Sequence, residues 1–508
     1  MPVITAANLE PHIGHLYTAV YADTLTRFGN LLQKDSTSLQ VGTDCHGSKV
    51  QKSALNGNMD PLEFTAKNSS LFKHLFGLAN VHYSRFVQTT DYSHKQTVAS
   101  VWSKLFDRGL IKKGEHSGWY SQVEESFIPS LYITTPDTSN TEVVGSIAEY
   151  CKDGITGNVE WVNETGYKFD LEPYRNGIKE WLLSNPTGNY DMMIIVILPK
   201  SEHKLMVEML STPLQNLSIS RPKNRVCWGI PVPNDQNATI YVWLDALMNY
   251  LPLIHEDKCT HIIGKDILKF HSIYWIAFLK ALDEPLPNQI ISHGHWLVDN
   301  KKMSKSDGNG VCPLSLLEIY HPDIVRFFLM RESGLNGDLR YNSKSIERLF
   351  KSELVNQLGN LVARCTSKKF QRPNGIKKEG LGLDNLQLEM LDNLWNATAT
   401  YVGLMGQFKV AESISIVMSH LSNVNQYWGI SEPWKMTQAQ QDAVLYLTLE
   451  SLRVSGILLQ PVMPETCSKL LDAIGVPKEQ RDIADAKTSH VGVFRIHQNV
   501  ILFPIKQE

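Results

Sequence analysis

The feature that most constrains the fold is a repeated pattern, in which a short apolar run ends at a glycine or at the start of a helical segment. The pattern occurs at 3–7, 39–41, 239–244, 260–263 and 289–292. Strands that alternate with helices favour a parallel sheet, because a parallel pair of strands needs a long crossover connection. We therefore predict an α/β fold with a doubly wound parallel sheet, which binds ligands at the carboxyl ends of its strands.

Length and changes of texture along the chain predict several domains. At 508 residues, the chain exceeds what a single hydrophobic core usually serves. The strand pattern occupies 1–110 and 221–340, mixed polarity marks an inserted β-rich or α+β unit at 111–220, and helical periodicity prevails at 341–508. We expect two halves of one catalytic domain, an insert between them and a helical bundle after them.

The first candidate site is the segment Pro11-His12-Ile13-Gly14-His15. It places two imidazoles at i and i+3 on one helix face, with a glycine between them that permits close approach of a ligand. This arrangement suits a nucleotide. Taken alone, such histidines more often lie on a helix surface or in a core.

The second candidate site is Lys302-Met303-Ser304-Lys305-Ser306, followed by a glycine-rich turn. Two lysines in a flexible loop can approach a triphosphate, on which negative charge builds during reaction. A lone segment of this kind is more often a solvated basic turn. The two sites together, in this order, favour nucleotide chemistry.

Charge alone leaves the choice of partner open. The formal net charge is −3, but 341–380 holds nine Lys or Arg against three acidic residues. A polyanion could dock on this local excess, although a solvated helix face is an equally good interpretation.

The cysteines and the hydrophobic runs limit which compartment, which metals and which kind of partner we expect for this chain. Seven cysteines are scattered without a CxxC pair, which predicts no structural zinc and a reducing environment. No apolar run reaches about 18 residues, so we expect no membrane partner. No targeting leader is visible before the first candidate site.

The two candidate sites resemble the paired signatures of class I aminoacyl-tRNA synthetases. Over nearly its whole length the chain is similar to methionyl-tRNA synthetases, and most to the short mitochondrial kind of fungi. The similarity is carried by Gly42-Thr-Asp-Cys-His-Gly47, Gly118-Trp-Tyr120, Leu217-Ser-Ile-Ser-Arg-Pro222, Trp228-Gly-Ile-Pro231, Tyr241-Val-Trp-Leu-Asp-Ala246, Ile263-Gly-Lys-Asp-Ile267 and Lys269-Phe-His271. It implies a Rossmann-type catalytic domain and a helical anticodon-binding domain.

The resemblance implies an enzyme that activates L-methionine with ATP and transfers it to the 3′ end of tRNA(Met). Rival hypotheses are a class I synthetase for cysteine or valine, and a tRNA-independent nucleotidylyltransferase. A catalytically silent tRNA-binding paralogue is a hypothesis from a different class. The block from Trp243 to Tyr250 and the helical tail argue against the first two, and intact histidines and lysines argue against the third.

The resemblance also implies the site residues. His12, His15, Lys302 and Lys305 are expected to be catalytic, through contacts with the ATP phosphates. Gly14, Gly264, Asp266 and Lys305 are expected to bind ATP, with Mg²⁺ as its counter-charge. The residues expected to bind methionine are Ile4, Asp44, Arg221, Trp243, Ala246, Leu247, Tyr250, Phe270, His271 and Trp275. Asp44 matches the position that holds the ammonium group, and the aromatic rings suit a thioether.

Anticodon recognition is expected at Asn356, Asn360, Arg364 and Trp434. The first three share an α-helix face at i, i+4 and i+8, from which they could read splayed bases while Trp434 stacks on one. Without the resemblance, the two asparagines would be assigned to a polar helix surface.

Departures from the family pattern sharpen these expectations. Cys45 stands where the family usually has glutamate, which leaves one carboxylate fewer beside Asp44. The segment Ser121–Phe127 stands where many relatives have metal-binding cysteines, so we expect no zinc in the insert. Ala6 replaces an aromatic residue, which suggests a truncated or misassigned beginning of the chain. We also expect a monomer, located in the mitochondrial matrix by resemblance, with the cytoplasm as the alternative.

Overall fold

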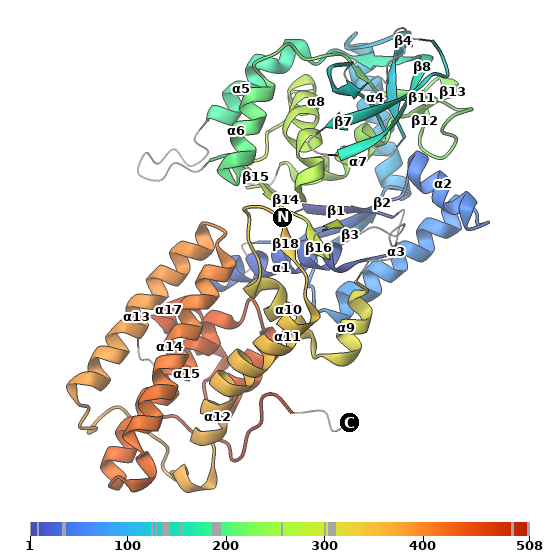
Figure 1. The fold of residues 1–508 in the computed structure, drawn as a ribbon. Coiled ribbons are helices and arrows are strands. Elements are labelled where there is room, and N and C mark those ends of the chain that lie inside the picture. The colour runs from blue at the N-terminus through green and yellow to red at the C-terminus, as the bar shows by residue number, and fades with distance from the viewer. Residues whose placement is uncertain are drawn as a thin grey trace. The chain divides into compact units, whose positions relative to one another are not determined.

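The computed structural model describes residues 2–7, 10–32, 37–122, 125–128, 130–134, 143–152, 155–184, 195–255, 258–298, 301–302, 311–488 and 492–504. The chain divides into two compact units (Figure 1). Unit 1 draws on 1–11, 40–74 and 84–293, and unit 2 draws on 12–39, 75–83 and 294–508.

Unit 1 contains two groups of parallel strands, of which β1, β2, β3, β14 and β15 are labelled in Figure 1. The first group is β1 (Pro2–Ala6), β2 (Gln40–Asp44) and β3 (Arg85–Gln88), and the second is β14 (Thr260–Gly264), β15 (Gln289–His293) and β9 (Ile197–Leu198). Since β1 also contacts β14, the strand order β3-β2-β1-β14-β15-β9 reverses direction along the chain between β1 and β14. This is the doubly wound order, and the predicted α/β fold class is confirmed.

The helices of unit 1 follow these strands and supply much of its core. They are α2 (Ser48–Asn56), the first part of α3 (Pro61–Leu78), α4 (Tyr92–Asp107), α5 (Arg175–Leu183), α6 (Lys200–Met209), α7 (Val242–Leu247) and α8 (Trp275–Leu282). Shorter helical turns are η1 (Ser130–Tyr132), η2 (Glu172–Tyr174), η3 (Met248–Leu253), η4 (Lys265–Ile267) and the π-helical η5 (Phe270–Tyr274). Helix α8 is almost wholly apolar and buried, as expected of a helix in a core.

The remaining strands of unit 1 form antiparallel sheets. One sheet has the order β5-β4-β8-β7-β6, with β10 paired to β8. Its strands are β4 (Ile111–Ser121), β5 (Ser126–Ile128), β6 (Ile133–Thr134), β7 (Ile147–Lys152), β8 (Ile155–Phe169) and β10 (Leu217–Ser218). A smaller sheet joins β11 (Ser220–Pro222), β12 (Pro231–Val232) and β13 (Asp235–Ile240). The larger sheet lies inside the insert predicted at 111–220, and the bounds of the four predicted segments stay predictions.

The strand predicted at 239–244 is wrong. Strand β13 ends at Ile240, and helix α7 begins at Val242. Most of α7 is buried, so its sequence is apolar on several sides and has the same appearance as a buried strand. The correction matters because α7 carries several predicted site residues.

Unit 2 is mainly helical, as predicted for 341–508. Its helices are α1 (Ile13–Leu32), α9 (Pro313–Ile319), α10 (Pro322–Arg331), α11 (Ser343–Leu349), the π-helical η6 (Phe350–Gly359), α12 (Asn360–Cys365), α13 (Asn385–Gly406), α14 (Val410–Ser431), α15 (Gln438–Leu459), α16 (Pro464–Ala473) and α17 (Ile483–Ala486). Shorter turns are η7 (Lys368–Phe370), η8 (Pro433–Lys435) and η9 (Lys478–Gln480). A small sheet joins β16 (Trp296–Val298), β17 (Lys301–Lys302) and β18 (Leu339–Arg340). No helix in the described part of the chain has both the length and the apolar character needed to cross a bilayer.

A buried arginine joins distant segments of unit 2. Arg326 on α10 is fully buried and pairs with Asp23 on α1 at 2.6 Å. The guanidinium also donates to the carbonyl oxygens of Ala79, Pro461 and Val462. These bonds compensate the charge and the donors, as a buried guanidinium requires. They fasten the first helix of the chain to the segment between α15 and α16.

Candidate functional site

The aromatic residues predicted to bind methionine lie together in unit 1. We call Trp243, Tyr250, Phe270, His271 and Trp275 the aromatic cluster. Trp243 on α7 stacks on Phe270 with ring centroids 3.7 Å apart and an interplanar angle of 6°. The ring of Tyr250 lies 5.4 Å from that of His271 and 6.0 Å from that of Trp275. Ala246 and Leu247, also predicted, are buried on the same helix as Trp243.

A chain of hydrogen bonds fixes the polar atoms of the cluster. Burial lowers the pKa of His271 to about 4, so its ring is neutral at physiological pH. Its Nδ1 lies 2.9 Å from the carbonyl oxygen of Ile267 and must carry the hydrogen. Its Nε2 therefore accepts from the Tyr250 hydroxyl, 3.0 Å away. The cluster thus consists of neutral side chains with polarisable rings, of which Trp243 and Phe270 are only partly buried, and such rings suit a thioether better than a charged group.

A π-helical turn brings Phe270 and His271 into the cluster. Element η5 covers Phe270–Tyr274, directly before the α-helix α8. A π-helical turn is wider than an α-helical one and recurs at functional sites in proteins. This turn could not be predicted from the sequence, because one additional residue in a turn leaves the composition of a helix unchanged.

Asp44 ends strand β2, at the carboxyl edge of the parallel sheet. Burial raises the pKa of its carboxyl group well above the usual value, and the negative charges of Asp245 and Glu125 raise it further. The backbone N–H of His46 donates to Asp44 Oδ1 at 3.3 Å and opposes this shift. A bound ammonium group would offset the repulsion, so the setting suits a cationic ligand.

The side chain of Cys45 takes no part in binding an ammonium group. Its side chain is fully buried, with Sγ 3.4 Å from Thr43 Oγ1 and 3.7 Å from Ser69 Oγ. Burial raises the pKa of the thiol, which keeps it neutral. Cysteine thus adds no further negative charge to a region that already holds Asp44, Asp245 and Glu125.

Sequence reasoning missed a buried charge cluster beside Asp44. The two carboxylate oxygens of Asp245 on α7 have different partners. One lies 2.6 Å from His46 Nδ1, and the other lies 2.7 Å from His94 Nε2. All three side chains are at most 3% exposed. His46 and Asp245 lie within motifs that were recognised, but nothing in the sequence pairs them, and His94 on α4 belongs to no motif.

The side chain of Arg221 contacts several neighbours within unit 1. Its guanidinium lies 4.4 Å from the centroid of the Tyr241 ring. One nitrogen donates to the Ser220 carbonyl oxygen at 2.8 Å and to Ser218 Oγ at 3.0 Å, and it lies 3.8 Å from the Glu164 carboxylate. Its Nε has no hydrogen-bond partner among the described residues. This donor is buried and unsatisfied, which is costly for a guanidinium.

His12 and His15 form a stacked pair at the start of α1 in unit 2. Their ring centroids are 3.8 Å apart. The backbone N–H of His12 donates to His15 Nδ1 at 3.2 Å, and that of Gly14 donates to His12 Nδ1 at 3.1 Å. Both Nδ1 atoms are therefore acceptors, which leaves an N–H at Nε2 of each neutral ring. These donors, at the positive end of a helix dipole, suit an anion.

Glycine at position 14 has a structural reason. A Cβ there would lie 2.9 Å from His12 Cε1, so any other residue would displace that ring. Gly264 is similar in unit 1, since a Cβ there would lie 2.8 Å from Asp266 Oδ1. Asp266 is exposed and folds back over the end of strand β14. This edge of the sheet is where nucleotides bind in doubly wound folds.

Some predicted site residues fall outside what the structure describes. They are Lys305, the side chain of Lys302 and the side chain of Ile4. Their proposed roles stay predictions.

The residues predicted to read the anticodon are exposed in unit 2. Asn356, Asn360 and Arg364 form what we call the helical face. Asn360 Nδ2 donates to the carbonyl oxygen of Asn356 at 3.1 Å, and Arg364 donates to Asn425 Oδ1 at 3.3 Å. Asn356 lies in the π-helical η6, another wide turn at a predicted site. Trp434 on η8 is 43% exposed, an unusual placement for so large an apolar ring.

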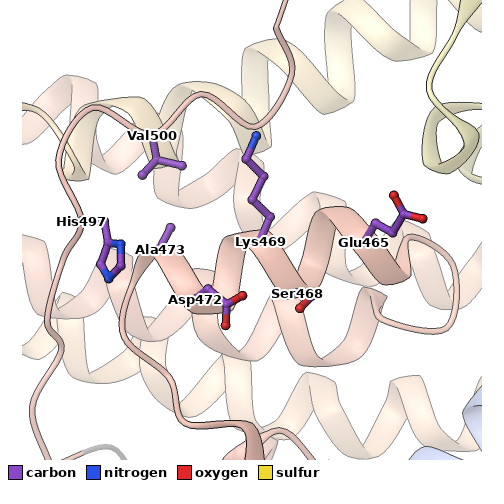
Figure 2. A pocket seen from close by; sticks show the side chains of 7 residues that line it. All are labelled: Glu465, Ser468, Lys469, Asp472, Ala473, His497 and Val500. Carbon is purple, nitrogen blue, oxygen red and sulfur yellow. The ribbon is translucent and has the colours of Figure 1, made fainter.

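The pocket in Figure 2 holds none of the predicted site residues. It has a volume of about 490 Å³ and lies between α16 and the C-terminal segment. Its lining residues are Glu465, Ser468, Lys469, Asp472, Ala473, His497 and Val500. Lys469 donates to the carbonyl oxygen of Ile501, and Asp472 accepts from Arg481. Two of its main charges are thus already engaged within the protein.

No group of three or more His, Cys, Asp or Glu side chains in the described segments is arranged to hold a metal ion. No disulfide joins the seven cysteines.

Comparison with known proteins gives one consistent result. The profile of the family described as "tRNA synthetases class I (M)" matches residues 3–366. A probable mitochondrial methionine–tRNA ligase of Dictyostelium discoideum is 35% identical, over 93% of this chain and 85% of that protein. The corresponding protein of Schizosaccharomyces pombe is 36% identical, over 94% of this chain and 90% of its own length.

Solved structures agree with the sequence relatives. The crystal structure of Mycobacterium tuberculosis methionyl-tRNA synthetase bound by methionyl-adenylate superposes with a TM-score of 0.88. It is 29% identical and covers 99% of both chains.

Proposed function

Since this chain belongs to the class I methionyl-tRNA synthetases, we propose that it activates L-methionine with ATP and transfers the methionyl group to the 3′ end of tRNA(Met). The family, the fold class and the enzyme class predicted from the sequence are confirmed. The observation that carries the proposal is the neutral aromatic cluster in the same unit as Asp44.

Methionine is held by its two ends. Its thioether lies among Trp243, Tyr250, Phe270, His271 and Trp275, and its ammonium group pairs with Asp44. Thioether sulfur interacts favourably with aromatic rings, and a charge-assisted hydrogen bond fixes the ammonium group. Further contacts to methionine come from Ile4, Arg221, Ala246 and Leu247.

The first reaction is attack on phosphorus. An oxygen of the methionine carboxylate forms a bond to the α-phosphorus of ATP, and the bond to the leaving pyrophosphate breaks. His12 and His15 donate from Nε2 to phosphate oxygens, and Lys302 and Lys305 neutralise charge on the pyrophosphate side. Such contacts accelerate the reaction because they strengthen as charge develops. Gly14, Gly264 and Asp266 border the nucleotide, and Mg²⁺ accompanies the phosphates.

The second reaction is transfer to tRNA. The 3′-terminal ribose hydroxyl attacks the methionyl carbonyl, and AMP leaves. Asn356, Asn360 and Arg364 read anticodon bases, while Trp434 stacks on one. Their exposure supports this assignment, because unpaired RNA bases are read by stacking and by hydrogen bonds to their edges.

We propose that the enzyme works as a monomer in the mitochondrial matrix. The names of relatives from Dictyostelium, fission yeast, mouse and human support this compartment. We also propose that the insert folds without structural zinc, because 121–127 contains no cysteine. Imaging of the gene product, light scattering and metal analysis of the purified protein test these three points.

Methionine-dependent ATP–pyrophosphate exchange tests the function directly. Purified protein should exchange pyrophosphate into ATP with methionine, and should not do so with cysteine or valine. Exchange with another amino acid would redirect the substrate assignment. No exchange with any amino acid, together with retained tRNA binding, would indicate the silent paralogue instead.

A further inference from the structure

A buried network with no assigned role lies next to the proposed ammonium site. His46 follows β2, His94 lies in the first turn of α4, and Asp245 lies on α7. The two imidazoles bond different oxygens of one carboxylate, at 2.6 and 2.7 Å. Burial by itself would raise the pKa of Asp245, but the two histidines outweigh burial and hold it at about 2. Asp245 is therefore a buried anion at every physiological pH.

This network is connected to Asp44 through His46. The backbone N–H of His46 donates to Asp44 Oδ1, while its ring is held by Asp245. Trp228 also holds the backbone between Asp44 and His46, since its indole N–H donates to the Cys45 carbonyl oxygen at 2.6 Å. The orientation of the Asp44 carboxylate thus depends on a peptide whose side chain is anchored in the core.

We propose that His46, Asp245 and His94 form a positioning cluster that aims the Asp44 carboxylate at the ammonium group of methionine. The inference rests on the proposed function and adds three positioning residues to it. His94 is the informative member, because it contacts Asp245 and lies on a different helix from every residue assigned to methionine. Its donor saturates the second carboxylate oxygen, and without it Asp245 would turn or draw in water.

Two pairs of substitutions separate the effect of losing a hydrogen-bond donor from the effect of losing the rest of the side chain. His94 donates from Nε2, whose place a glutamine amide can take, so His94→Gln is the conservative partner of His94→Ala. His46 donates from Nδ1, whose place an asparagine amide can take, so His46→Asn is the partner of His46→Ala. The second pair keeps the inference testable if His94→Ala does not fold.

The probes are two competitive inhibitors that differ only in the amino group. They are L-methioninol and 4-(methylsulfanyl)butan-1-ol, assayed in methionine-dependent ATP–pyrophosphate exchange. His94→Ala should raise the inhibition constant of methioninol about tenfold, because a donor to a charged group is lost. It should leave the constant of the amine-free alcohol unchanged within about twofold, and His94→Gln should restore most of the methioninol affinity.

Several results would overturn the inference. One is an equal rise in the inhibition constants of both inhibitors. Another is an unchanged inhibition constant of methioninol in both alanine variants. A third is that the glutamine and asparagine variants bind methioninol as weakly as the alanine variants. His420→Ala is a matched control, since His420 is another buried imidazole, bonded to Ser451 in unit 2. It should lower the melting temperature and leave both inhibition constants unchanged. Wild-type protein without methionine-dependent exchange would instead refute the proposed function.

Discussion

The aromatic cluster of unit 1 and the helical face of unit 2 differ in how their residues are supported. Tyr250, His271 and Trp275 are fully buried and Tyr250 contacts the other two, whereas Asn356 and Arg364 are exposed. A change in the cluster therefore alters its neighbours and the stability of the fold as well as ligand contacts. A change on the helical face alters recognition with little cost in stability.

The largest effect is expected for Asp44→Asn, which keeps the shape of the side chain and removes its charge. The value of kcat/KM for methionine in pyrophosphate exchange should fall about 100-fold or more, because a partly buried charge pair loses one partner. The KM for ATP should change little. Near-normal methionine kinetics would show that the ammonium group is held elsewhere.

Trp434→Ala probes the exposed side of the comparison. Exchange should stay near normal, while the rate of tRNA charging should fall about tenfold to hundredfold, because stacking on one base is lost. Since the ring is 43% exposed, the melting temperature should change little. An equal loss in exchange and in charging would contradict the assignment of Trp434 to tRNA recognition alone.

Tyr250→Phe probes the internal bonds of the aromatic cluster. The change removes the donor to His271 Nε2 and leaves a buried acceptor without its partner. We expect the KM for methionine to rise about tenfold and the free energy of unfolding to fall by about 1–2 kcal/mol. Denaturant unfolding and exchange kinetics on the same preparation measure both. A changed KM with unchanged stability would show that the two properties are less coupled than the packing indicates.

The smallest effect is a dependence of stability on pH. The raised pKa of Asp44 means that the folded protein keeps its proton at pH values where the unfolded chain has lost it. Stability contributed by this group should therefore fall as pH rises from the ordinary carboxyl pKa towards the raised one. Asp44→Asn removes this term, so the variant should gain stability relative to wild type over that range. Parallel unfolding curves at all pH values would contradict the pKa shift.

Sequence reasoning identified residues that recur in motifs and missed those whose role depends on a distant partner. The resemblance assigned Trp243, Tyr250 and Phe270 to one site, and in the structure Trp243 stacks on Phe270 while His271 lies beside both Trp243 and Tyr250. His94 could not be found in this way, because its partner Asp245 lies far along the chain. The same limit explains the error at 239–244, where burial on several sides removed the period that separates helix from strand.

The strand ends and the helical tail were predictable because both depend on local signals. Strands β14 and β15 follow the predicted runs closely, since a buried parallel strand is a continuous apolar segment. The π-helical η5 and η6 were not predictable, since one additional residue in a turn leaves the composition unchanged. Both lie at predicted binding residues.

The arginine at position 326 has a consequence for the order in which the protein can be assembled. During synthesis, the helix that carries His15 leaves the ribosome long before residues 461 and 462, whose carbonyls share the guanidinium with Asp23. Until those residues emerge, the early helix lacks part of its native support. A nascent chain stalled after α10 can form the Asp23–Arg326 pair but lacks two carbonyl acceptors of the guanidinium, so the packing around this arginine is completed only when translation is nearly finished.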